Sequence, residues 1–181
     1  SDKSLATASV TIPTSALNIN GYDGEKVRDG IIIASDFAHV DPYRASTHNK
    51  GIMNGIDAVA LATGNDWRAI EAGAHAFAAR HGRYSALSKW SSDNEGNLVG
   101  KIELPIKVGT VGGPMESNPA VALNLRIINV ESAMELASVM AAVGLAQNFS
   151  ALKALVTEGI QTGHMTLHAR SVVKAAGTPV K

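Results

Sequence analysis

The sequence predicts a helix-rich α+β domain with few strands. Apolar residues make up 45% of the 181 positions and charged residues 18%, which supplies a core and argues against disorder. Two segments, 5–13 and 97–110, alternate apolar and polar residues as half-buried strands do. Longer segments between and after them repeat apolar residues at intervals of three or four, the period of an amphipathic helix. The length suits one domain, or a domain with an appendage.

The two predicted strands have clear alternation. In LATASVTIP, Ala8, Val10 and Ile12 alternate with threonine and serine, and Pro13 ends the strand because it has no amide proton to donate. In NLVGKIELPIKVGT, apolar residues occupy most even-numbered positions, and charged residues occupy the other face: Lys101, Glu103 and Lys107. The turn-rich SSDNEGN precedes this longer amphipathic strand.

The first predicted helix begins after Asp23, which can cap it. Val27, Ile31 and Ala34 follow at i, i+4 and i+7 of one apolar face. The dipeptide at 41–42, Asp-Pro, predicts a turn, because a residue before proline is pushed out of the helical region.

The second predicted helix runs from near Thr47 toward Thr63. Its two glycines, Gly51 and Gly55, each cost about 1 kcal/mol against alanine inside a helix. We therefore expect them to allow close packing or the approach of a substrate.

The remaining elements are predicted from caps and breakers. Asn65 or Asp66 can cap a third helix, for which Gly82 is the stop. GGPMESNP predicts a loop, and two further helices are expected at about 132–144 and 145–159. The tail 171–181 has weak patterning and is expected to fray.

Charge and composition exclude several classes of protein. Sixteen basic residues balance sixteen acidic ones, which predicts neither a nucleic-acid partner nor a membrane-surface partner. Cysteine is absent, so the sequence holds no disulfide framework and no thiolate metal site. No apolar run reaches the roughly 18 residues of a membrane span, and the first residues lack the pattern of a signal peptide. A soluble cytoplasmic protein is the expectation.

One lysine stands out in an apolar stretch, THNKGIMNGIDAVALATGND. Lys50, Asn54 and Asp57 occur at i, i+4 and i+7, which places them on one helix face. Asp66 lies sixteen residues beyond Lys50, where its carboxylate could turn back and keep the lysine protonated in a dry pocket. A cation held in this way can stabilise a developing oxyanion. The residues alone favour a plainer alternative, a surface lysine and an N-capping aspartate.

Two histidines near the end of the chain form a second candidate site. His164 and His168 are spaced i, i+4, but the zinc motif HExxH needs a glutamate where this sequence has Met165, and no third ligand is evident. No metal site is therefore predicted. A single general-acid histidine on a mobile segment remains open beside a structural histidine pair. GTVGGP lacks the GxGxxG order, so the residues do not indicate dinucleotide binding.

Three long motifs resemble a known family. DPYRASTHNKGIMNGIDAVALATGNDWRAIEAGAHAFA, GTVGG and VGLAQNFSALKALVTEGIQTGHMTLHAR are similar, in this order, to class II, the soluble bacterial-type 3-hydroxy-3-methylglutaryl-CoA (HMG-CoA) reductases. The resemblance extends from about Val10 to Arg170. It implies reduction of HMG-CoA to mevalonate and CoA, or the reverse oxidation, with NADH or NADPH through two hydride transfers.

The resemblance also implies roles for individual residues. Lys50 matches the lysine that stabilises the thioester and mevaldehyde oxygen, and Asp66 matches an aspartate in a hydrogen-bonded network with that lysine and a glutamate. His164 matches the histidine that protonates the departing CoA thiolate. The substrate-binding matches are Arg44, for the free carboxylate, with Asn54 beside it, and Gln147 and Asn148 on the substrate and CoA side.

The sequence departs from the family in two respects. The catalytic glutamate of the ENVIG-like motif and the DAMG-type nucleotide-binding motif have no counterpart among these 181 residues. The resemblance therefore implies the C-terminal part of a longer reductase, which binds the nicotinamide mainly through a region absent from this chain. On this reading 1–157 belong to a large CoA-substrate-binding domain and 158–181 begin a mobile C-terminal helical flap. The family forms its active sites at a homodimer interface. The alternative is a non-catalytic CoA-thioester-binding or assembly fragment.

Overall fold

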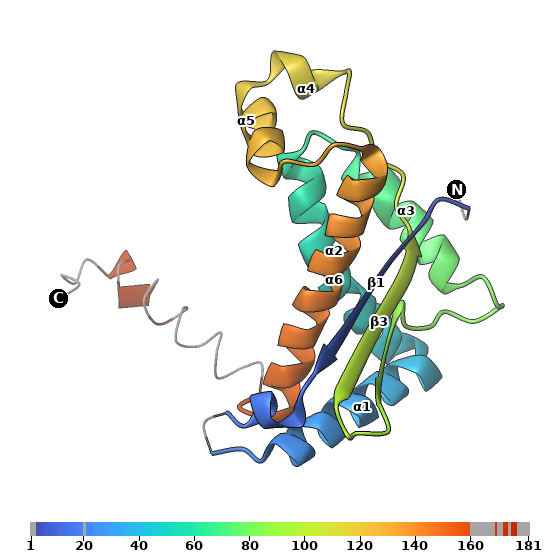
Figure 1. Ribbon diagram of the computed structural model, residues 1–181, viewed down its shortest axis with the longest axis vertical. Helices are drawn as coiled ribbons and strands as arrows, with labels where there is room; N and C mark the ends of the chain where they lie inside the picture. The colour runs from blue at the N-terminus through green and yellow to red at the C-terminus, as the bar shows by residue number, and fades with distance from the viewer. Residues whose placement is uncertain (1–2, 20, 160–168, 170–171, 174, 177–181) are drawn as a thin grey trace.

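A computed structural model describes residues 3–19, 21–159, 169, 172–173 and 175–176 of the chain. The strands are β1 (Leu5–Ile12), β2 (Ser88–Ser92) and β3 (Leu98–Pro105). The helices are the 3-10 turn η1 (Thr14–Leu17), α1 (Gly24–Val40), α2 (Pro42–Ala62), α3 (Trp67–Ala78), α4 (Pro114–Ser117), α5 (Pro119–Ile128) and α6 (Ala133–Val156). The predicted α+β class with few strands is confirmed, and α2 and α6 run side by side next to the sheet (Figure 1).

The sheet is antiparallel with the order β1-β3-β2. Central β3 buries Leu98, Ile102 and Leu104 toward the helices and exposes Lys101 and Glu103, as the alternation predicted. The sequence analysis did not predict β2. Its segment SKWSS buries only its first and third residues, so too few apolar positions reveal the period of two.

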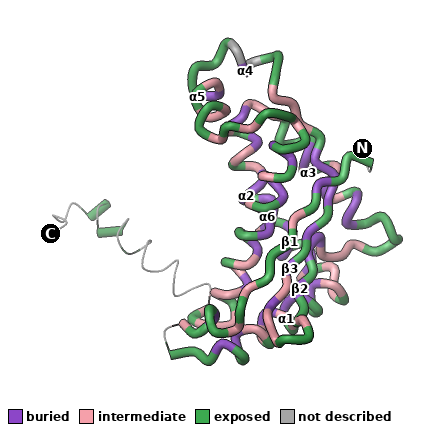
Figure 2. The backbone as a smooth tube through the Cα atoms, in the orientation of Figure 1, coloured by how far each residue is buried: buried purple, intermediate pink, exposed green. Residues whose placement is uncertain are grey.

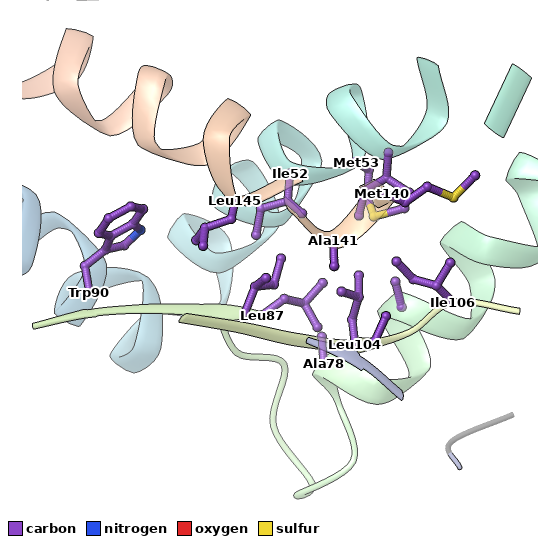
Figure 3. Packing of buried hydrophobic residues seen from close by; sticks show 14 of the residues in the cluster. Ile52, Met53, Ala78, Leu87, Trp90, Leu104, Ile106, Met140, Ala141 and Leu145 are labelled. Atoms are coloured by element: carbon purple, nitrogen blue, oxygen red, sulfur yellow. The ribbon is translucent and has the colours of Figure 1, made fainter. Parts of the chain in front are cut away.

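The core lies between the sheet and the α2–α6 pair. Figure 3 shows Ile52 and Met53 of α2 with Met140, Ala141 and Leu145 of α6, facing strand residues such as Leu104. Buried positions recur along both helices, whereas α5 buries only Val121 (Figure 2). This packing fixes α2 against α6 along most of their length.

Helix α6 is continuous, so the predicted division into two helices at 144–145 is wrong. Gly144 allows close packing instead of ending a helix, because a Cβ there would lie 2.9–3.1 Å from Ile56 and Ile52. Among the residues that the structure describes, α6 is the one helix long and apolar enough to cross a membrane by length and composition. Its packing against α2 and β1 accounts for that apolar character.

Helix α2 begins at Pro42, which corrects the predicted start near residue 47. The side chain of Asp41 caps the helix by accepting hydrogen bonds from the amides of Tyr43 and Arg44. Proline is favourable in the first helical turn, where its missing amide proton has no partner to lose. The turn predicted at 41–42 is therefore the helix start.

The predicted aspartate caps of the other helices are confirmed. Asp23 accepts hydrogen bonds from the amides of residues 25 and 26, and α1 follows it. Asp66 accepts from the amides of Arg68 and Ala69 at the start of α3. Helix α3 ends at Ala78, one turn before the predicted glycine stop.

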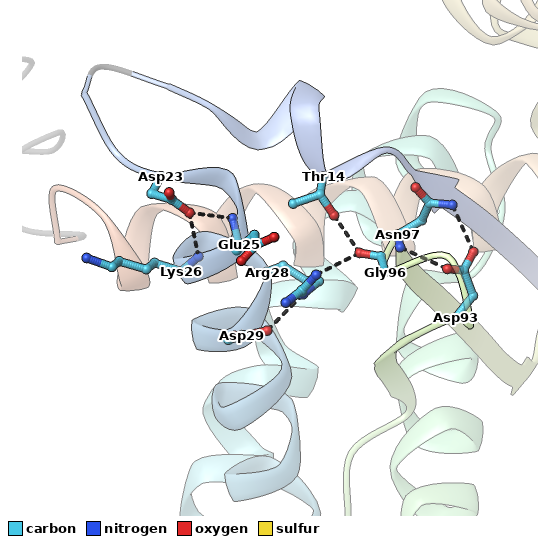
Figure 4. Close-up of polar contacts among 9 residues, drawn as sticks. All are labelled: Thr14, Asp23, Glu25, Lys26, Arg28, Asp29, Asp93, Gly96 and Asn97. Carbon is cyan, nitrogen blue, oxygen red and sulfur yellow. Dashed lines mark hydrogen bonds and ion pairs between the residues drawn. The ribbon is translucent and has the colours of Figure 1, made fainter.

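The turn between β2 and β3 is held by side chains (Figure 4). Asp93 accepts hydrogen bonds from the amide and the side chain of Asn97. Arg28 and Thr14 both donate to the carbonyl of Gly96, which ties this turn to α1 and to η1. The turn predicted from SSDNEGN is thus confirmed.

The segment after β3 is more helical than predicted. One turn of helix, α4, interrupts the predicted loop, and the unpredicted α5 follows Asn118, whose side chain caps it. Only Val121 of α5 is buried, although most of its residues are apolar.

Candidate active site

A pocket of about 540 Å³ lies between α2 and α6. Helix α2 contributes Arg44, Thr47, His48, Lys50, Gly51 and Asn54. Helix α6 and the residues after it contribute Gln147, Asn148, Ser150, Ala151, Ala154, Glu158 and Gly159. The pocket therefore joins five of the seven predicted site residues.

The spacing along α2 explains why these side chains meet. Arg44 and His48, and likewise Lys50 and Asn54, are four residues apart and lie one turn above each other on the helix. Gly51 lies between them, and a Cβ at this position would meet no atom within 4 Å. Gly51 thus leaves open space on the pocket side.

Gly55, one turn further, has the opposite surroundings. A Cβ there would lie 3.1 Å from the backbone oxygen of Val143 and 3.1 Å from the Cβ of Gln147. The two glycines of the second predicted helix thus serve the two expected purposes separately. Gly51 provides space for a ligand, and Gly55 allows close helix packing.

Lys50 is exposed at the pocket wall, which corrects the expectation of a dry environment around it. Among the described residues, no carboxylate oxygen lies within the 4 Å of an ion pair with its ammonium group. Within the described part of the chain, the ammonium group of Lys50 thus has no carboxylate partner.

Arg44 provides a second cation in the same pocket. It is partly buried, and burial lowers the pKa of its guanidinium. Its backbone amide donates to Asp41, but no described carboxylate pairs with its side chain. A planar guanidinium can donate two parallel hydrogen bonds to a carboxylate.

Gln147 and Asn148 have different surroundings although they are adjacent. Gln147 is exposed on the pocket side of α6. Asn148 is 1% exposed, and its Oδ1 accepts hydrogen bonds from Trp90 Nε1 at 2.8 Å and Ser88 Oγ at 2.9 Å. Because these partners occupy its oxygen, Asn148 forms the floor of the pocket and is not placed to hydrogen-bond a substrate through Oδ1.

The sequence analysis does not single out His48, and the structure places it in the pocket floor. It is 3% exposed, and its Nε2 lies 2.7 Å from Ser88 Oγ. Burial lowers the pKa of His48 to about 3, and the charge of Arg44 adds to this effect. Its position between Arg44 and Lys50 on one helix was the available sequence signal.

Asp66 does not line this pocket. Helix α2 continues for 12 residues from Lys50 to its end at Ala62, a rise of roughly 18 Å at 1.5 Å per residue. The amide of Asn65 donates to the carbonyl of Ala60, which keeps the neighbouring Asp66 at that far end of the helix. The expectation that Asp66 turns back toward Lys50 within one chain is therefore wrong. Asp66 acts as the N-cap of α3, and its side chain is 63% exposed.

The residue before Asp66 ties this turn to the glycine-rich loop. Asn65 Oδ1 accepts from the amide of Gly109 at 2.9 Å, and Asn65 Nδ2 donates to the carbonyl of Gly109 at 3.2 Å. Nδ2 also lies 3.0 Å from Thr63 Oγ1. The ATGND and GTVGG motifs therefore meet at one place in the fold.

Asp57 lies beyond the pocket although it shares the face of Lys50 and Asn54. Its Oδ1 is buried without a hydrogen-bond partner in the described part of the chain. Burial, followed by the charge of Glu71 on α3 and a hydrogen bond with it, raises the pKa of Asp57 to about 7. The expected three-residue face is thus divided between the pocket and the α2–α3 contact.

His164 and His168 lie outside the described residues. In the part of the chain that is described, no group of three or more His, Asp or Glu side chains is arranged to hold a metal ion.

Comparison with known proteins gives the same family repeatedly. The family model for hydroxymethylglutaryl-coenzyme A reductase matches residues 1–169. A 3-hydroxy-3-methylglutaryl-coenzyme A reductase from Archaeoglobus fulgidus is 58% identical over 154 residues, which cover 85% of this chain and 35% of that protein. A probable reductase of the same name from Borreliella burgdorferi is 49% identical over 144 residues, which cover 79% of this chain and 33% of that protein.

Solved structures agree with this result. The 3-hydroxy-3-methylglutaryl-coenzyme A reductase from Streptococcus pneumoniae matches with a TM-score of 0.83 and 53% identity, over 97% of this chain and 42% of that one. A structure of the class II enzyme from the same organism, bound to NADPH in open conformations, matches with a TM-score of 0.82 and 54% identity, over 97% of this chain and 43% of that one. The chain thus spans about a third of the length of the curated relatives.

Proposed function

Because the chain belongs to the hydroxymethylglutaryl-coenzyme A reductase family, we propose that it forms the substrate-binding part of a reductase. The whole protein would reduce HMG-CoA to mevalonate and CoA with NADH or NADPH, or run the reverse oxidation. The pocket between α2 and α6 carries this proposal, because it joins two cations and two amide side chains on opposite walls: Arg44, Lys50, Asn54 and Gln147.

The pocket's cations suit the two ends of the HMG group. Arg44 would bind the free carboxylate through paired hydrogen bonds, for which a guanidinium is the matching shape. Lys50, about two turns further along α2, would contact the thioester oxygen and stabilise the negative charge that develops there during reduction. Asn54 and Gln147 would orient the substrate by hydrogen bonds from the two helices.

Asp66 would serve a pocket on a second copy of the chain. Lys50 lies near the middle of α2 and Asp66 lies beyond its C-terminal end, and the intervening half of the helix keeps the two groups apart within one chain. The homodimer that the family resemblance implies provides the other arrangement. In a two-fold dimer each pocket would receive Lys50 from one protomer and Asp66 from its partner.

His164 would protonate the departing CoA thiolate. Gly159 lines the pocket, and five residues of chain span at most about 17 Å, which leaves His164 within reach of the thioester. Since α6 ends at Val156, we place the boundary between the substrate-binding body, 1–157, and the start of the C-terminal flap, 158–181, just after it.

The described residues lack the common fold of dinucleotide-binding domains. Their sheet is a small antiparallel one, without the parallel βαβ unit and phosphate-binding turn of a nucleotide fold. We therefore assign no nicotinamide site to them and place this site mainly in the part of the reductase outside this chain.

The test is a spectrophotometric assay with the whole reductase and with the 181-residue chain. HMG-CoA should cause oxidation of NADH or NADPH only with the whole protein. The chain alone should bind HMG-CoA, measured by calorimetry, without turnover, as the alternative of a CoA-thioester-binding fragment also predicts. Failure of the whole protein to oxidise either nucleotide would refute the proposed function, and robust turnover by the chain alone would refute its incompleteness.

A further inference from the structure

Four buried side chains from three elements meet under the pocket: His48 of α2, Ser88 and Trp90 of β2, and Asn148 of α6. Ser88 Oγ lies 2.7 Å from His48 Nε2 and 2.9 Å from Asn148 Oδ1. Asn148 Nδ2 lies 3.2 Å from His48 Nε2, and Trp90 Nε1 donates to Asn148 Oδ1 at 2.8 Å. All four residues are at most 3% exposed.

This cluster is polar although the surrounding contact between α2 and α6 is apolar. Buried polar groups carry a desolvation cost, which hydrogen bonds only offset. The imidazole of His48 is not fully satisfied, because its Nδ1 is buried without a partner in the described part of the chain. Apolar side chains of similar size would fill the same space without this cost, so the cluster is difficult to explain by stability alone.

The rest of the α2–α6 contact is apolar and closely packed. Gly55 and Gly144 provide close approach, and aliphatic side chains such as Ile52 and Ile56 fill the contact. Apolar attraction has no preferred direction. Hydrogen bonds between Asn148, Ser88 and His48 are directional, and a shift of one helix by 1 Å would break them.

The neighbours of these residues are the pocket residues themselves. His48 precedes Lys50 by two positions, and Asn148 follows Gln147 directly. We propose that His48, Ser88 and Asn148 are positioning residues, which hold Lys50 and Asn54 of α2 at a fixed distance from Gln147 of α6. This inference rests on the proposed function of the pocket.

The neutral state of His48 is consistent with such a role. Burial and the charges of Arg44 and His39 lower its pKa to about 3. The imidazole therefore adds no third positive charge beside Arg44 and Lys50 at neutral pH. Among the described residues, the charged side chains that line the pocket are then the cations Arg44 and Lys50 and the carboxylate of Glu158.

A matched pair of serine substitutions separates positioning from stability. Ser88→Ala removes the hydroxyl that connects α2 with α6. Ser35→Ala removes a hydroxyl that is also fully buried and contacts the same strand, where Ser35 Oγ accepts from the amide of Trp90 at 3.1 Å. Both variants of the whole reductase would be compared by kcat, KM and Tm. We expect similar falls in Tm, but a fall in kcat of about 10- to 100-fold for Ser88→Ala alone, since misplacement by 1 Å can have such an effect.

A second pair tests the histidine. His48→Gln places an amide nitrogen near the position of Nε2 and should restore most of the kcat lost in His48→Leu. Unchanged kcat in Ser88→Ala, equal losses in both serine variants, or no difference between the two histidine variants would each overturn the positioning role.

A measurement on the 181-residue chain separates this inference from the proposed function. Asn148→Asp introduces a carboxylate beside the imidazole and should raise the pKa of His48 by at least about one unit, because an opposite charge favours the protonated ring. The ring resonances of His48 in an NMR titration report this shift whether or not the protein is a reductase. Absence of the shift would overturn the contact on which the positioning role depends.

Discussion

The two ends of α2 carry predicted catalytic residues in different surroundings. The N-terminal half presents Arg44 and Lys50 to a pocket whose floor is held by hydrogen bonds to α6 and β2. The C-terminal end leads to Asp66, which is exposed and lies beside the glycine-rich loop held by Asn65. Because the C-terminal half of α2 separates them, the pocket of one chain contains Lys50 but not Asp66.

This difference shows how proximity in sequence can mislead about proximity in space. A spacing of sixteen residues is short along the chain, yet twelve of them extend α2 as a rod. Lys50 therefore pairs in space with Gln147, which is 97 positions away in the sequence, and not with Asp66.

The largest effect on activity is expected for the part of α2 that lines the pocket. Lys50→Ala in the whole reductase should lower kcat by at least about 100-fold, because one oxyanion-stabilising donor typically accounts for that much. Its Tm should hardly change, since the lysine is exposed. Steady-state kinetics of HMG-CoA reduction and thermal unfolding measure the two quantities.

Two further lysine variants sharpen this test. Lys101→Ala, on the exposed face of β3, is the matched control and should keep its activity. Lys50→Arg should remain defective, because a planar guanidinium cannot replace a compact ammonium at one point. Full activity in Lys50→Ala would remove Lys50 from the catalytic set.

A mixing experiment tests whether the two ends of α2 serve different protomers. Lys50→Ala and Asp66→Asn should each be inactive alone. Unfolded together and refolded as a mixture, they should recover about a quarter of the wild-type kcat, because half of the dimers are mixed and each has one intact site of two. If both residues served the same chain's pocket, every site in the mixture would carry a defect, and no activity would return.

The middle of α2 offers a comparison of two glycines in the 181-residue chain. Gly55→Ala should destabilise the fold by about 1–3 kcal/mol, because its Cβ would press against the backbone of α6. Gly51→Ala should stabilise it by up to about 1 kcal/mol, since alanine is the better helix former and the space is open. Denaturant titrations measure both changes, and changes of the same sign would contradict the assigned surroundings.

The smallest effect, on the pH dependence of stability, is expected for Asp57, which lies on α2 between the pocket and the C-terminal end of this helix. Its folded-state pKa of about 7 lies above the usual value of 3.8, so the folded state binds a proton more tightly than the unfolded state. This contribution to the free energy of unfolding is present in full below about pH 4 and is lost as the pH rises to about 7. Asp57→Asn should flatten this part of the stability curve, measured by urea titrations at pH 5 and pH 8. An unchanged slope would assign the dependence to other groups.

Local features of the fold could be predicted from the sequence, and long-range contacts could not. Asp23 and Asp66 were predicted as caps because capping depends on the next three residues only. Strand β2 was missed because its pairing with β3 gives SKWSS its structure. Gly144 was expected to end a helix because a sequence does not show the isoleucines that pack against it.

The same division applies to the candidate site. The family resemblance indicated Arg44, Lys50, Asn54 and Gln147, which line one pocket. It also indicated Asn148 as a substrate contact, but the partners of its side chain come from β2, which was not predicted. The position of Asp66 relative to Lys50 could not be predicted without the length of α2. The place of His48 could not be predicted without the buried partners that lie under the pocket.

The chain has two tryptophans, one under the pocket and one beside Asp66. Trp90, fully buried, donates its indole proton to Asn148, whereas Trp67, next to Asp66, is 37% exposed. Their fluorescence should differ accordingly, with blue emission that acrylamide cannot quench from Trp90 and red-shifted, quenchable emission from Trp67. The chain thus contains one optical reporter for the pocket floor and another for the surface around Asp66, so that the proposed substrate binding and the proposed dimer assembly can be tested separately without any added label.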